Sequence, residues 1–557
     1  MKRNYNLFLL MVLTFFTTST QALPERIGDF ALLDLSGNFH QISRYQHRKA
    51  VVLMSYEDSC PNMDAQLANY SHLATHFADE DIEFLLITTS NSSNTIHNIP
   101  ILLDETQLVS ESLGIEKAGD VRVLAPQRLS LLYKGAVTAT LQQVLSSVES
   151  SANETVYGEN LGACVISYPA QEYYKANPPD YARDIAPLVI DKCVECHHPD
   201  GVGPFAMENY LFLLGWSPMI REVLMNRRMP PTQVDEARGY SPDSRQLRSE
   251  QLQMLIHWIN SGAPRGNSEQ DPLAEHVQQN NEQWLIGEPD YIVTAPSHSV
   301  PATGILDYQY ETIDLNFKED RWVQAVQFQP GNHKVLHHLM AYVTPPDEDF
   351  WGPERNGAPV NRRFLDSYVP GAARVREFQP GTAVLIPAGH RLALQFHYMS
   401  YGVEVVDQTR IGLYFADTPL EPLEVETLAL PVTDFVLPPR VEHFPLQAEH
   451  LFDEAVVITG VRARMNTRGK SMRFSAIFPD GTAHSMLSVP SYNYAWQAHY
   501  TLDAPVQLPA GSRVVVSGAF DNSISNPTNP DPNREVRAGF QTRDEVFIGY
   551  FTYHRAE

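Results

Sequence analysis

Two adjacent histidines, His337 and His338, stand in the otherwise apolar stretch HKVLHHLMAY, residues 333 to 342. Neighbouring side chains on a strand point to opposite faces, so both rings reach one metal ion only at a strand end or a bulge. His397, in the strand-like stretch LALQFHYMSYG, is a third candidate ligand. Three imidazoles suit copper or zinc, with copper ahead in intrinsic affinity. The alternative for the doublet is one core histidine and one solvated histidine.

A second group of reactive side chains is Cys193-x-x-Cys196-His197, in the stretch KCVECHHPDG. Two thiols on one helical turn can add to the vinyl groups of a haem, and the next residue then points its imidazole at the iron. A zinc site would need a second ligand pair, and the sequence has no second C-x-x-C. A thioredoxin-type pair would follow a buried strand, whereas the preceding YARDIAPLVIDK looks helical. The motif therefore predicts haem c.

A sixth ligand to haem iron is usually a methionine or a histidine. Met229 lies in the proline-rich loop RRMPPT, at a suitable distance along the chain from the haem motif. We expect Met229 to take this role, with His198 and His257 as competitors. An ordinary loop methionine is the alternative.

Cys60 lies between an expected strand and an expected helix, in EDSCPNMD. This placement resembles the active-site corner of thioredoxin-like proteins of the peroxiredoxin type. Met63 stands where thioredoxins have a second cysteine, and Glu57 where peroxiredoxins usually have threonine. The neighbouring carboxylates disfavour a nucleophilic thiolate, so we expect a redox-inert thioredoxin-like fold. Cys60 and Cys164, the two remaining thiols, either pair in an oxidising compartment or stay free.

Expected strands and helices alternate over residues 23–170, which predicts the α/β thioredoxin-like domain. The proline of Ala125-Pro126 is expected to be the cis-proline of that fold. The predicted strands are AVVLMSY (50–56), IEFLLITTS (82–90) and LSLLYKGAV (129–137), and the predicted helix is MDAQLANYSHLATHFADE (63–80).

The rest of the chain divides into a helical part and a strand-rich part. A polar linker, QEYYKANPPD (171–180), precedes helical segments, and we expect a small α-helical cytochrome c-like domain over residues 175–268. From about residue 285 short alternating strands are separated by turn signals such as PATG, QPGN and FPDG, which predicts antiparallel β-sandwich sheets. The expected fold class is therefore multidomain.

The first residues, MKRNYNLFLLMVLTFFTTSTQA, predict a secretory signal over residues 1–22, with an uncleaved anchor as the alternative. No later run is long and apolar enough to cross a bilayer, so we expect a periplasmic or secreted protein. Export agrees with haem c, which is attached outside the bacterial cytoplasm. The net charge of -25 argues against nucleic-acid partners.

The words HHLMAY and LQFHYMSYG resemble the copper type II, ascorbate-dependent monooxygenases, which include peptidylglycine and dopamine hydroxylating enzymes. The resemblance implies two jelly-roll-like sandwiches, here residues 282–416 and 417–557, each with one copper in the family. His337, His338 and His397 match the ligands of the electron-transfer copper. WLIGEPDYIV, YVPGA and PAGHRLALQFHY resemble bacterial relatives that carry redoxin, cytochrome and copper modules in this order.

The second, oxygen-activating copper of that family is held by a His-x-His pair and a methionine near the C-terminus. The matching words here are RARMNTRGKSM and DEVFIGYF, so the resemblance places Arg464, Asn466 and Val546 at the three ligand positions. Arginine stays protonated and cannot bind a metal, asparagine is a poor copper ligand, and valine is none. Misregister is the alternative. A substitute site would draw on His484, His499 or His554.

Two functions follow from these residues. The first is a binding or electron-transfer protein with one haem and one copper, whose partner is an electron donor or acceptor protein or a small reductant. The second is an active copper monooxygenase that uses haem-delivered electrons on a small-molecule substrate, which requires a rebuilt oxygen site. A remoter third function is a thiol reductase centred on Cys60.

Overall fold

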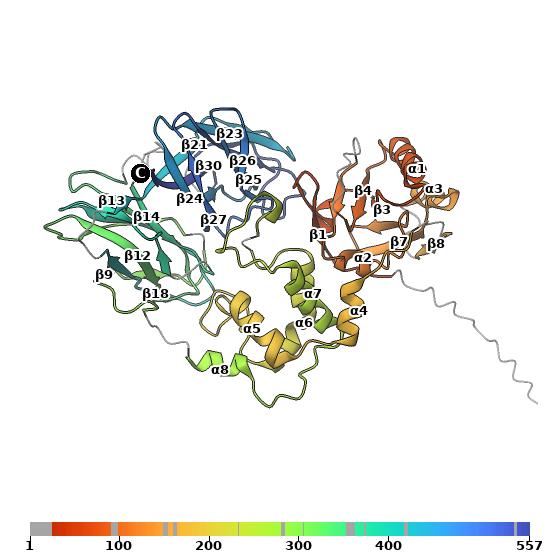
Figure 1. The fold of residues 1–557 in the computed structure, drawn as a ribbon, viewed down its shortest axis with the longest axis horizontal. Coiled ribbons are helices and arrows are strands. Elements are labelled where there is room, and N and C mark those ends of the chain that lie inside the picture. The colour runs from red at the N-terminus through yellow and green to blue at the C-terminus, as the bar shows by residue number, and fades with distance from the viewer. Residues whose placement is uncertain are drawn as a thin grey trace, which may run out of the picture.

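The computed structural model shows four structural units (Figure 1). The predicted signal sequence, residues 1–22, lies outside the described residues. The structure describes residues 25–90, 99–148, 154–159, 164–231, 233–279, 284–304, 306–351, 363–371, 375–416, 422–539 and 543–556.

A mixed sheet with strand order β2-β1-β5-β4-β3-β6-β7-β8 forms the N-terminal domain. Its neighbouring strands β3 and β4 are parallel and largely buried, which explains the continuous apolar runs at 50–56 and 82–90. The predicted α/β thioredoxin-like architecture is confirmed. Its elements are β1 (Ala31–Asp34), β2 (Phe39–Gln41), η1 (Ile42–Tyr45), β3 (Ala50–Ser55), α1 (Met63–His76), β4 (Ile82–Thr88), β5 (Ile101–Leu103), α2 (Leu108–Ser112), β6 (Val121–Ala125), β7 (Ser130–Gly135), α3 (Ala139–Ser146) and β8 (Val156–Tyr157).

The predicted cis bond at Ala125-Pro126 is wrong. The cis bond among the described residues is Met229-Pro230. Pro126 instead follows β6 in the turn to β7, where the amide of Arg128 donates to the carbonyl of Ala125 over 3.2 Å. A trans proline suits the second position of such a turn because its fixed φ matches the turn geometry.

The two faces of the sheet pack against different parts of the chain, because alternate residues of a strand point to opposite sides. Val52 belongs to a core that includes residues of α1 and α3. Val51 belongs to a core that continues into the following helices and includes Tyr181 and Trp258. The helices after residue 168 therefore cover one face of the thioredoxin-like sheet.

This helical region starts before the expected boundary, because the stretch predicted as a linker begins inside α4, which opens with Pro169. Its helical elements are α4 (Pro169–Ala176), η2 (Tyr181–Ile185), α5 (Ala186–Val189), η3 (Ile190–Val194), α6 (Tyr210–Met225), η4 (Glu236–Arg238), α7 (Ser249–Asn260) and α8 (Pro272–Gln279).

The first sandwich packs the sheet β11-β17-β13-β14 against the sheet β20-β16-β12-β19-β9, with one apolar core between them. Its strands are β9 (Tyr291–Thr294), β10 (His298–Val300), β11 (Gln309–Asp314), β12 (Arg321–Gln329), β13 (Leu336–Thr344), β14 (Arg363–Tyr368), β15 (Val375–Glu377), β16 (Thr382–Ile386), β17 (Arg391–Tyr398), β18 (Val405–Asp407), β19 (Arg410–Phe415) and β20 (Leu423–Glu424).

The second sandwich packs the sheet β21-β30-β24-β27 against the sheet β23-β28-β25-β26 around its own core. Its strands are β21 (Glu426–Val432), β22 (Val436–Leu437), β23 (Phe444–Leu451), β24 (Val456–Arg464), β25 (Gly469–Ile477), β26 (Ala483–Val489), β27 (His499–Leu508), β28 (Arg513–Phe520), β29 (Val536–Arg537) and β30 (Phe547–Arg555).

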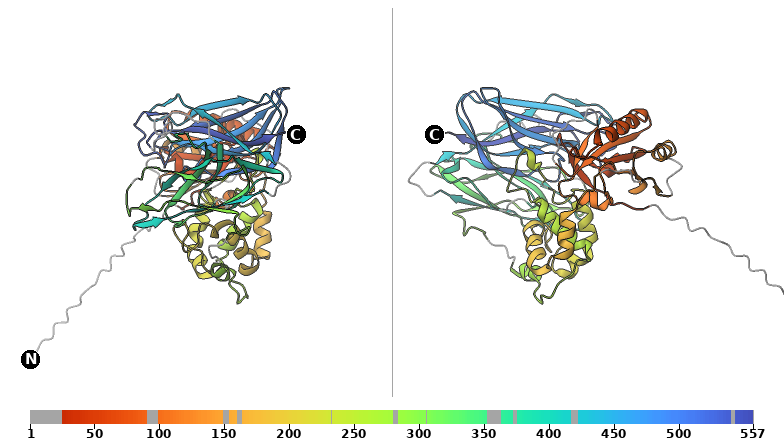
Figure 2. Two further views of the ribbon diagram at one scale, coloured as in Figure 1. Left: turned by 90° about the vertical axis from the view of Figure 1, so that its left-hand side faces the viewer. Right: turned by 45° about the vertical axis from the view of Figure 1, so that its right-hand side comes forward.

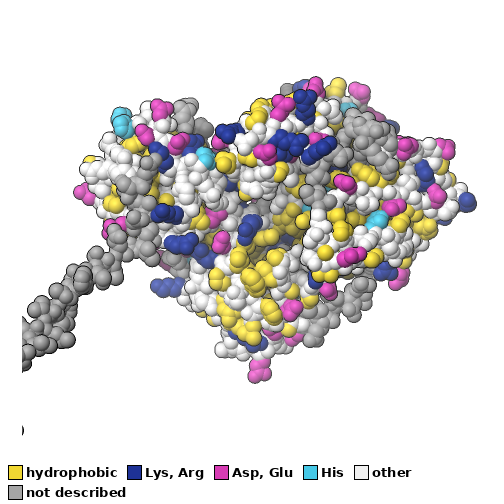
Figure 3. Space-filling model, turned by 180° about the vertical axis from the view of Figure 1, so that it is seen from behind, with side chains coloured by type: hydrophobic (Ala, Val, Ile, Leu, Met, Phe, Trp, Pro, Cys, Tyr) yellow, Lys and Arg dark blue, Asp and Glu magenta, His cyan; other side chains and the backbone are white. Residues whose placement is uncertain are grey.

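The helical region lies below the sandwiches in every view (Figures 1 and 2). Hydrogen bonds tie it to the second sandwich, for example from the amide of Asp235 to the carbonyl of Ser488 over 2.9 Å. Hydrophobic side chains gather on the lower part of the surface seen from behind (Figure 3). Among the described residues, no helix is long and apolar enough to cross a membrane.

Candidate metal centre and cofactor cavity

The three predicted metal ligands come together on two paired strands of the first sandwich. His338 on β13 pairs with His397 on β17, and the register shifts between Leu336 and His338. This bulge lets the rings of His337 and His338 approach one another although the residues are adjacent. All three side chains are buried, at 7%, 1% and 7% exposure for His337, His338 and His397.

The three rings converge through their Nδ1 atoms. The Nδ1 atoms of His337 and His338 are 2.9 Å apart, and those of His337 and His397 are 3.2 Å apart. Nitrogen ligands about 2 Å from a metal ion, as in zinc sites, lie at about this separation from one another. Within the described part of the chain, this is the cluster of three or more His, Cys, Asp or Glu that could hold a metal ion.

The surroundings keep the three rings neutral. Burial, with a smaller effect from His397, lowers the pKa of His337 to about 3, and burial and Arg464 lower that of His397 to about 4. The pKa of His338 is also well below its usual value, first because of burial. Neutral imidazoles keep a lone pair for a cation, so the donor set fits one copper or zinc ion.

Two tyrosines that the sequence analysis did not single out flank the triad. Tyr308 stacks on the ring of His397 with centroids 4.9 Å apart, and Tyr494 of the second sandwich stacks on His337 at 5.8 Å. Tyr494 lies in the aromatic-rich stretch SYNYAWQ, which was the available sequence signal. The triad therefore faces the second sandwich.

The positions matched to a second copper lie at the end of β24, two residues beyond it, and directly before β30. Arg464 pairs with Ile548, and the amide of Asn466 donates to the carboxylate of Glu545, the residue before Val546. The side-chain amide of Asn466 donates a hydrogen bond to the carbonyl of Asp544 over 2.9 Å. These buried positions thus supply a cation, an engaged amide and an alkyl group, which is no copper donor set.

Among the described residues, none of the three histidines considered for a substitute site belongs to a group of three possible metal ligands. His484 is exposed on β26. The ring of His499 is within hydrogen-bonding distance of Arg376 and Thr552, and His554 donates to the carbonyl of Arg555.

A buried arginine on β24 was missed in the sequence. Arg462 is 1% exposed, and its guanidinium lies between the rings of Phe364 and Tyr550, 4.3 and 4.1 Å from their centroids. It also donates to the sulfur of Met340 over 3.0 Å. Two aromatic faces partly offset the cost of burying this charge between the sandwiches.

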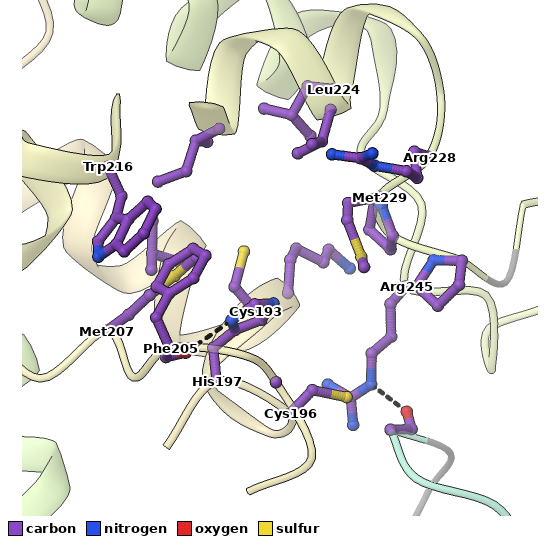
Figure 4. Close-up of a pocket in the computed structure, with 18 of the residues that line it drawn as sticks. Cys193, Cys196, His197, Phe205, Met207, Trp216, Leu224, Arg228, Met229 and Arg245 are labelled. Carbon is purple, nitrogen blue, oxygen red and sulfur yellow. Dashed lines mark hydrogen bonds between the residues drawn. The ribbon is translucent and has the colours of Figure 1, made fainter. Parts of the chain in front are cut away.

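A mainly apolar cavity of about 450 Å³ in the helical region brings the predicted haem residues together. Cys193, Cys196 and His197 line one side, and Met229 lies across from them (Figure 4). Apolar and aromatic side chains fill most of the wall, while Lys192, Arg228 and Arg245 supply cations for carboxylate groups such as haem propionates.

The ring of His197 is oriented as an iron ligand requires. Its Nδ1–H donates to the carbonyl of Phe205 over 2.9 Å, which leaves Nε2 with a free lone pair. Burial raises the pKa of the Cys193 and Cys196 thiols to about 12. A thioredoxin-type redox pair needs a lowered thiol pKa, so this environment does not fit that alternative.

The candidate sixth ligands separate by position. Met229 lines the cavity, as does Met207, which the sequence analysis did not consider. His198 lies outside, with its ring 5.9 Å from that of His333, and His257 stacks on Tyr174 under α4. Of the predicted candidates, Met229 is the one that the cavity admits.

Cys60 and Cys164 form a disulfide, with Cα atoms 5.9 Å apart. Glu57 accepts hydrogen bonds from the amide and hydroxyl of Thr89 and from the hydroxyl of Ser90. The disulfide ties the segment before α4 to the corner that follows β3.

The comparisons with known proteins concern the thioredoxin-like domain. Residues 24–132 match the model of the AhpC/TSA family. A search of curated proteins found no match.

Solved structures similar to this chain include peroxidoxin BcpB from Mycobacterium tuberculosis, at 18% identity over 23% of this chain and 96% of that chain, with a TM-score of 0.20. The bacterioferritin comigratory protein of Xanthomonas campestris is 13% identical over 24% and 99%, with a TM-score of 0.20. A thiol:disulfide interchange protein from Bacteroides sp. is 15% identical over 20% and 80%, with a TM-score of 0.18. The family match and the sheet together identify the N-terminal part of this multidomain chain as a thioredoxin-like domain.

Proposed function

We propose that this chain is an exported redox protein, periplasmic or secreted, that binds one haem c and one copper ion and transfers electrons. Cys193 and Cys196 would attach the haem, with His197 and Met229 as axial ligands. His337, His338 and His397 would hold the copper. The sandwiches are those of the copper type II monooxygenase-like class, with the electron-transfer copper retained and the oxygen site lost.

The observation that carries this proposal is the contrast between the two predicted copper sites. Three neutral imidazoles converge through Nδ1 atoms 2.9 and 3.2 Å apart in the first sandwich. The second sandwich offers Arg464, Asn466 and Val546 at the matched positions, and none of them is a good copper ligand. A chain with one such site can hold and pass an electron but lacks the family's second metal.

The haem part of the proposal is supported by the cavity. The C-x-x-C-H motif lines an apolar space of about 450 Å³, the thiols stay protonated, and His197 presents Nε2. When bound, the haem supplies a one-electron couple. The residues of this chain bind it, orient its axial ligands and exclude water from it.

Metal stoichiometry tests the proposal. The protein is produced with haem maturation and loaded with copper, and copper is counted per haem with electron paramagnetic resonance as the reporter. We expect one copper per haem. The copper should be lost in His337→Ala and kept in the control variant His484→Ala, which removes an exposed histidine. Two coppers per haem would favour the active monooxygenase, and a chain without haem or copper would refute the proposal.

A further inference from the structure

A single loop of the second sandwich reaches both candidate cofactor sites. This aromatic loop, residues 490–498 with the sequence PSYNYAWQA, connects β26 to β27. We propose that the electron partner of the histidine triad is the haem of the same chain, and that the aromatic loop connects them through Trp496 and Tyr494. This inference rests on the proposed function and adds the partner that it leaves open.

At the haem end, Trp496 closes the cavity of the C-x-x-C-H motif. Gly371, which follows β14 of the first sandwich, lies between Cys196 and Trp496. A methyl group on Gly371 would stand 2.5 Å from the sulfur of Cys196 and 3.0 Å from the Trp496 ring. The tryptophan ring and the thiol that would be bonded to the haem thus both lie against Gly371.

At the copper end, Tyr494 lies two residues before Trp496 and stacks on His337 at 5.8 Å with an interplanar angle of 28°. Its centroid is 6.5 Å from that of His397. Only Ala495 separates the two aromatic residues in sequence. The path from the haem-attachment thiol to a metal ligand therefore runs past Gly371 to the Trp496 ring, along a short piece of backbone, and through the stacked ring of Tyr494.

The aromatic loop is held firmly in the second sandwich. The hydroxyl of Tyr492 accepts from the amide of Met465 and donates to its carbonyl, over 3.0 and 2.8 Å. The amides of Ala495 and Trp496 donate to the side chain and the carbonyl of Asn493. Fixed contacts matter because electronic coupling between two centres falls steeply when a gap opens between them.

The first sandwich offers a second, longer connection. His198, next to the haem ligand, contacts His333, which precedes β13 by three residues. Removal of either aromatic ring of the loop should therefore slow the transfer and leave a residual rate.

The step is balanced as a simple electron transfer. With both groups bound, the haem held by the C-x-x-C-H motif would be oxidised from ferrous to ferric, and the copper held by the histidine triad would be reduced from Cu(II) to Cu(I). No bond forms or breaks and no proton moves.

The test uses the full chain loaded with haem and copper. Pulse radiolysis reduces the haem, and its absorbance then reports the transfer of the electron to Cu(II). We expect a first-order phase whose rate is independent of protein concentration. Trp496→Leu and Tyr494→Leu should each slow it several-fold, whereas Tyr494→Phe, which keeps the ring, and Tyr157→Leu in the thioredoxin-like domain should not.

Copper and haem are counted in every variant before the kinetics. Should Tyr494→Leu lose copper, Trp496→Leu carries the test, because it does not contact the triad. Unchanged rates in the leucine variants, or a rate that rises with protein concentration, would overturn this inference while the proposed function stands. A wild-type chain that binds only one of the two cofactors would overturn both.

Discussion

The two sandwiches put different side chains on corresponding strands. β13 and β24 each lie inside a sheet, in the orders β11-β17-β13-β14 and β21-β30-β24-β27. Each also has a register shift against a neighbouring strand. β13 carries His337 and His338 near its start, whereas β24 ends in Arg464 and is followed by Asn466.

A sandwich of this kind does not by itself make a metal site. In the first sandwich burial keeps three imidazoles neutral and available. In the second, a guanidinium that cannot lose its proton occupies the matched position. Function on a shared architecture therefore depends on a few donor atoms, and these are what substitutions should address.

The largest effect is expected where the first sandwich loses a ligand. His338→Ala removes one of three nitrogen donors. Loss of a residue that only hydrogen-bonds a metal ligand lowers metal affinity about 10–100-fold, so loss of the ligand itself should lower copper affinity by more. Equilibrium copper titration measures the loss. The exposed His484→Ala is the control, and retained tight binding in His338→Ala would remove the triad from the proposal.

The second prediction makes the two sandwiches alike. The triple variant Arg464→His, Asn466→His and Val546→Met should gain one further copper per chain. It would restore the two histidines and the methionine that hold the second copper in the copper type II monooxygenases. Copper counting by atomic spectroscopy checks this result. The single change Val546→Met serves as the control, since one thioether alone does not form a site. A folded triple variant without extra copper would show that these positions are matched in the wrong register.

The sequence predicted more of the first site than of its surroundings. The histidine doublet demanded a strand end or bulge, and the register shift at His338 is that bulge. The α/β pattern also predicted the thioredoxin-like sheet, because parallel strands buried on both faces leave continuous apolar runs. These features depend on local sequence.

Contacts between distant segments were not predictable in the same way. Tyr494 on His337 and Trp496 beside Cys196 join residues that lie far apart in the chain. The prediction of a linker missed helix α4, because this short helix is largely polar. It is positioned by packing on α7. Such packing is set by tertiary structure, which single-sequence periodicity does not report.

The third prediction uses pH to test the burial of the histidine triad. The triad histidines have a folded-state pKa near 3 to 4 for His337 and His397, against an ordinary value of 6.5. Below about pH 6.5 these histidines are protonated in the unfolded chain but stay neutral in the folded, metal-free site. The free energy of unfolding should therefore fall with decreasing pH, by up to about 1.4 kcal/mol per pH unit for each ring.

Urea unfolding of metal-free protein at pH 7 and pH 5 measures this loss. His337→Phe should make the decline shallower, because one buried imidazole is gone, whereas His484→Ala should leave it unchanged. Equal pH profiles for wild type and His337→Phe would mean that the triad is hydrated and already titrates near its ordinary pKa.

The smallest effect is expected from removal of the positive charge of Arg464. Arg464 lowers the pKa of His338 and His397, so its positive charge acts on the triad across the sandwich interface. The same charge opposes Cu(II) more than Cu(I), so Arg464→Gln should lower the reduction potential of bound copper. A shift of at most about 60 mV is expected, since about 59 mV is tenfold in a one-electron equilibrium. Redox titration followed by electron paramagnetic resonance measures it, with the exposed Arg513→Gln of the same sandwich as the control. A potential that does not move, or that rises, would mean that the charge of Arg464 does not control the potential of copper at the triad.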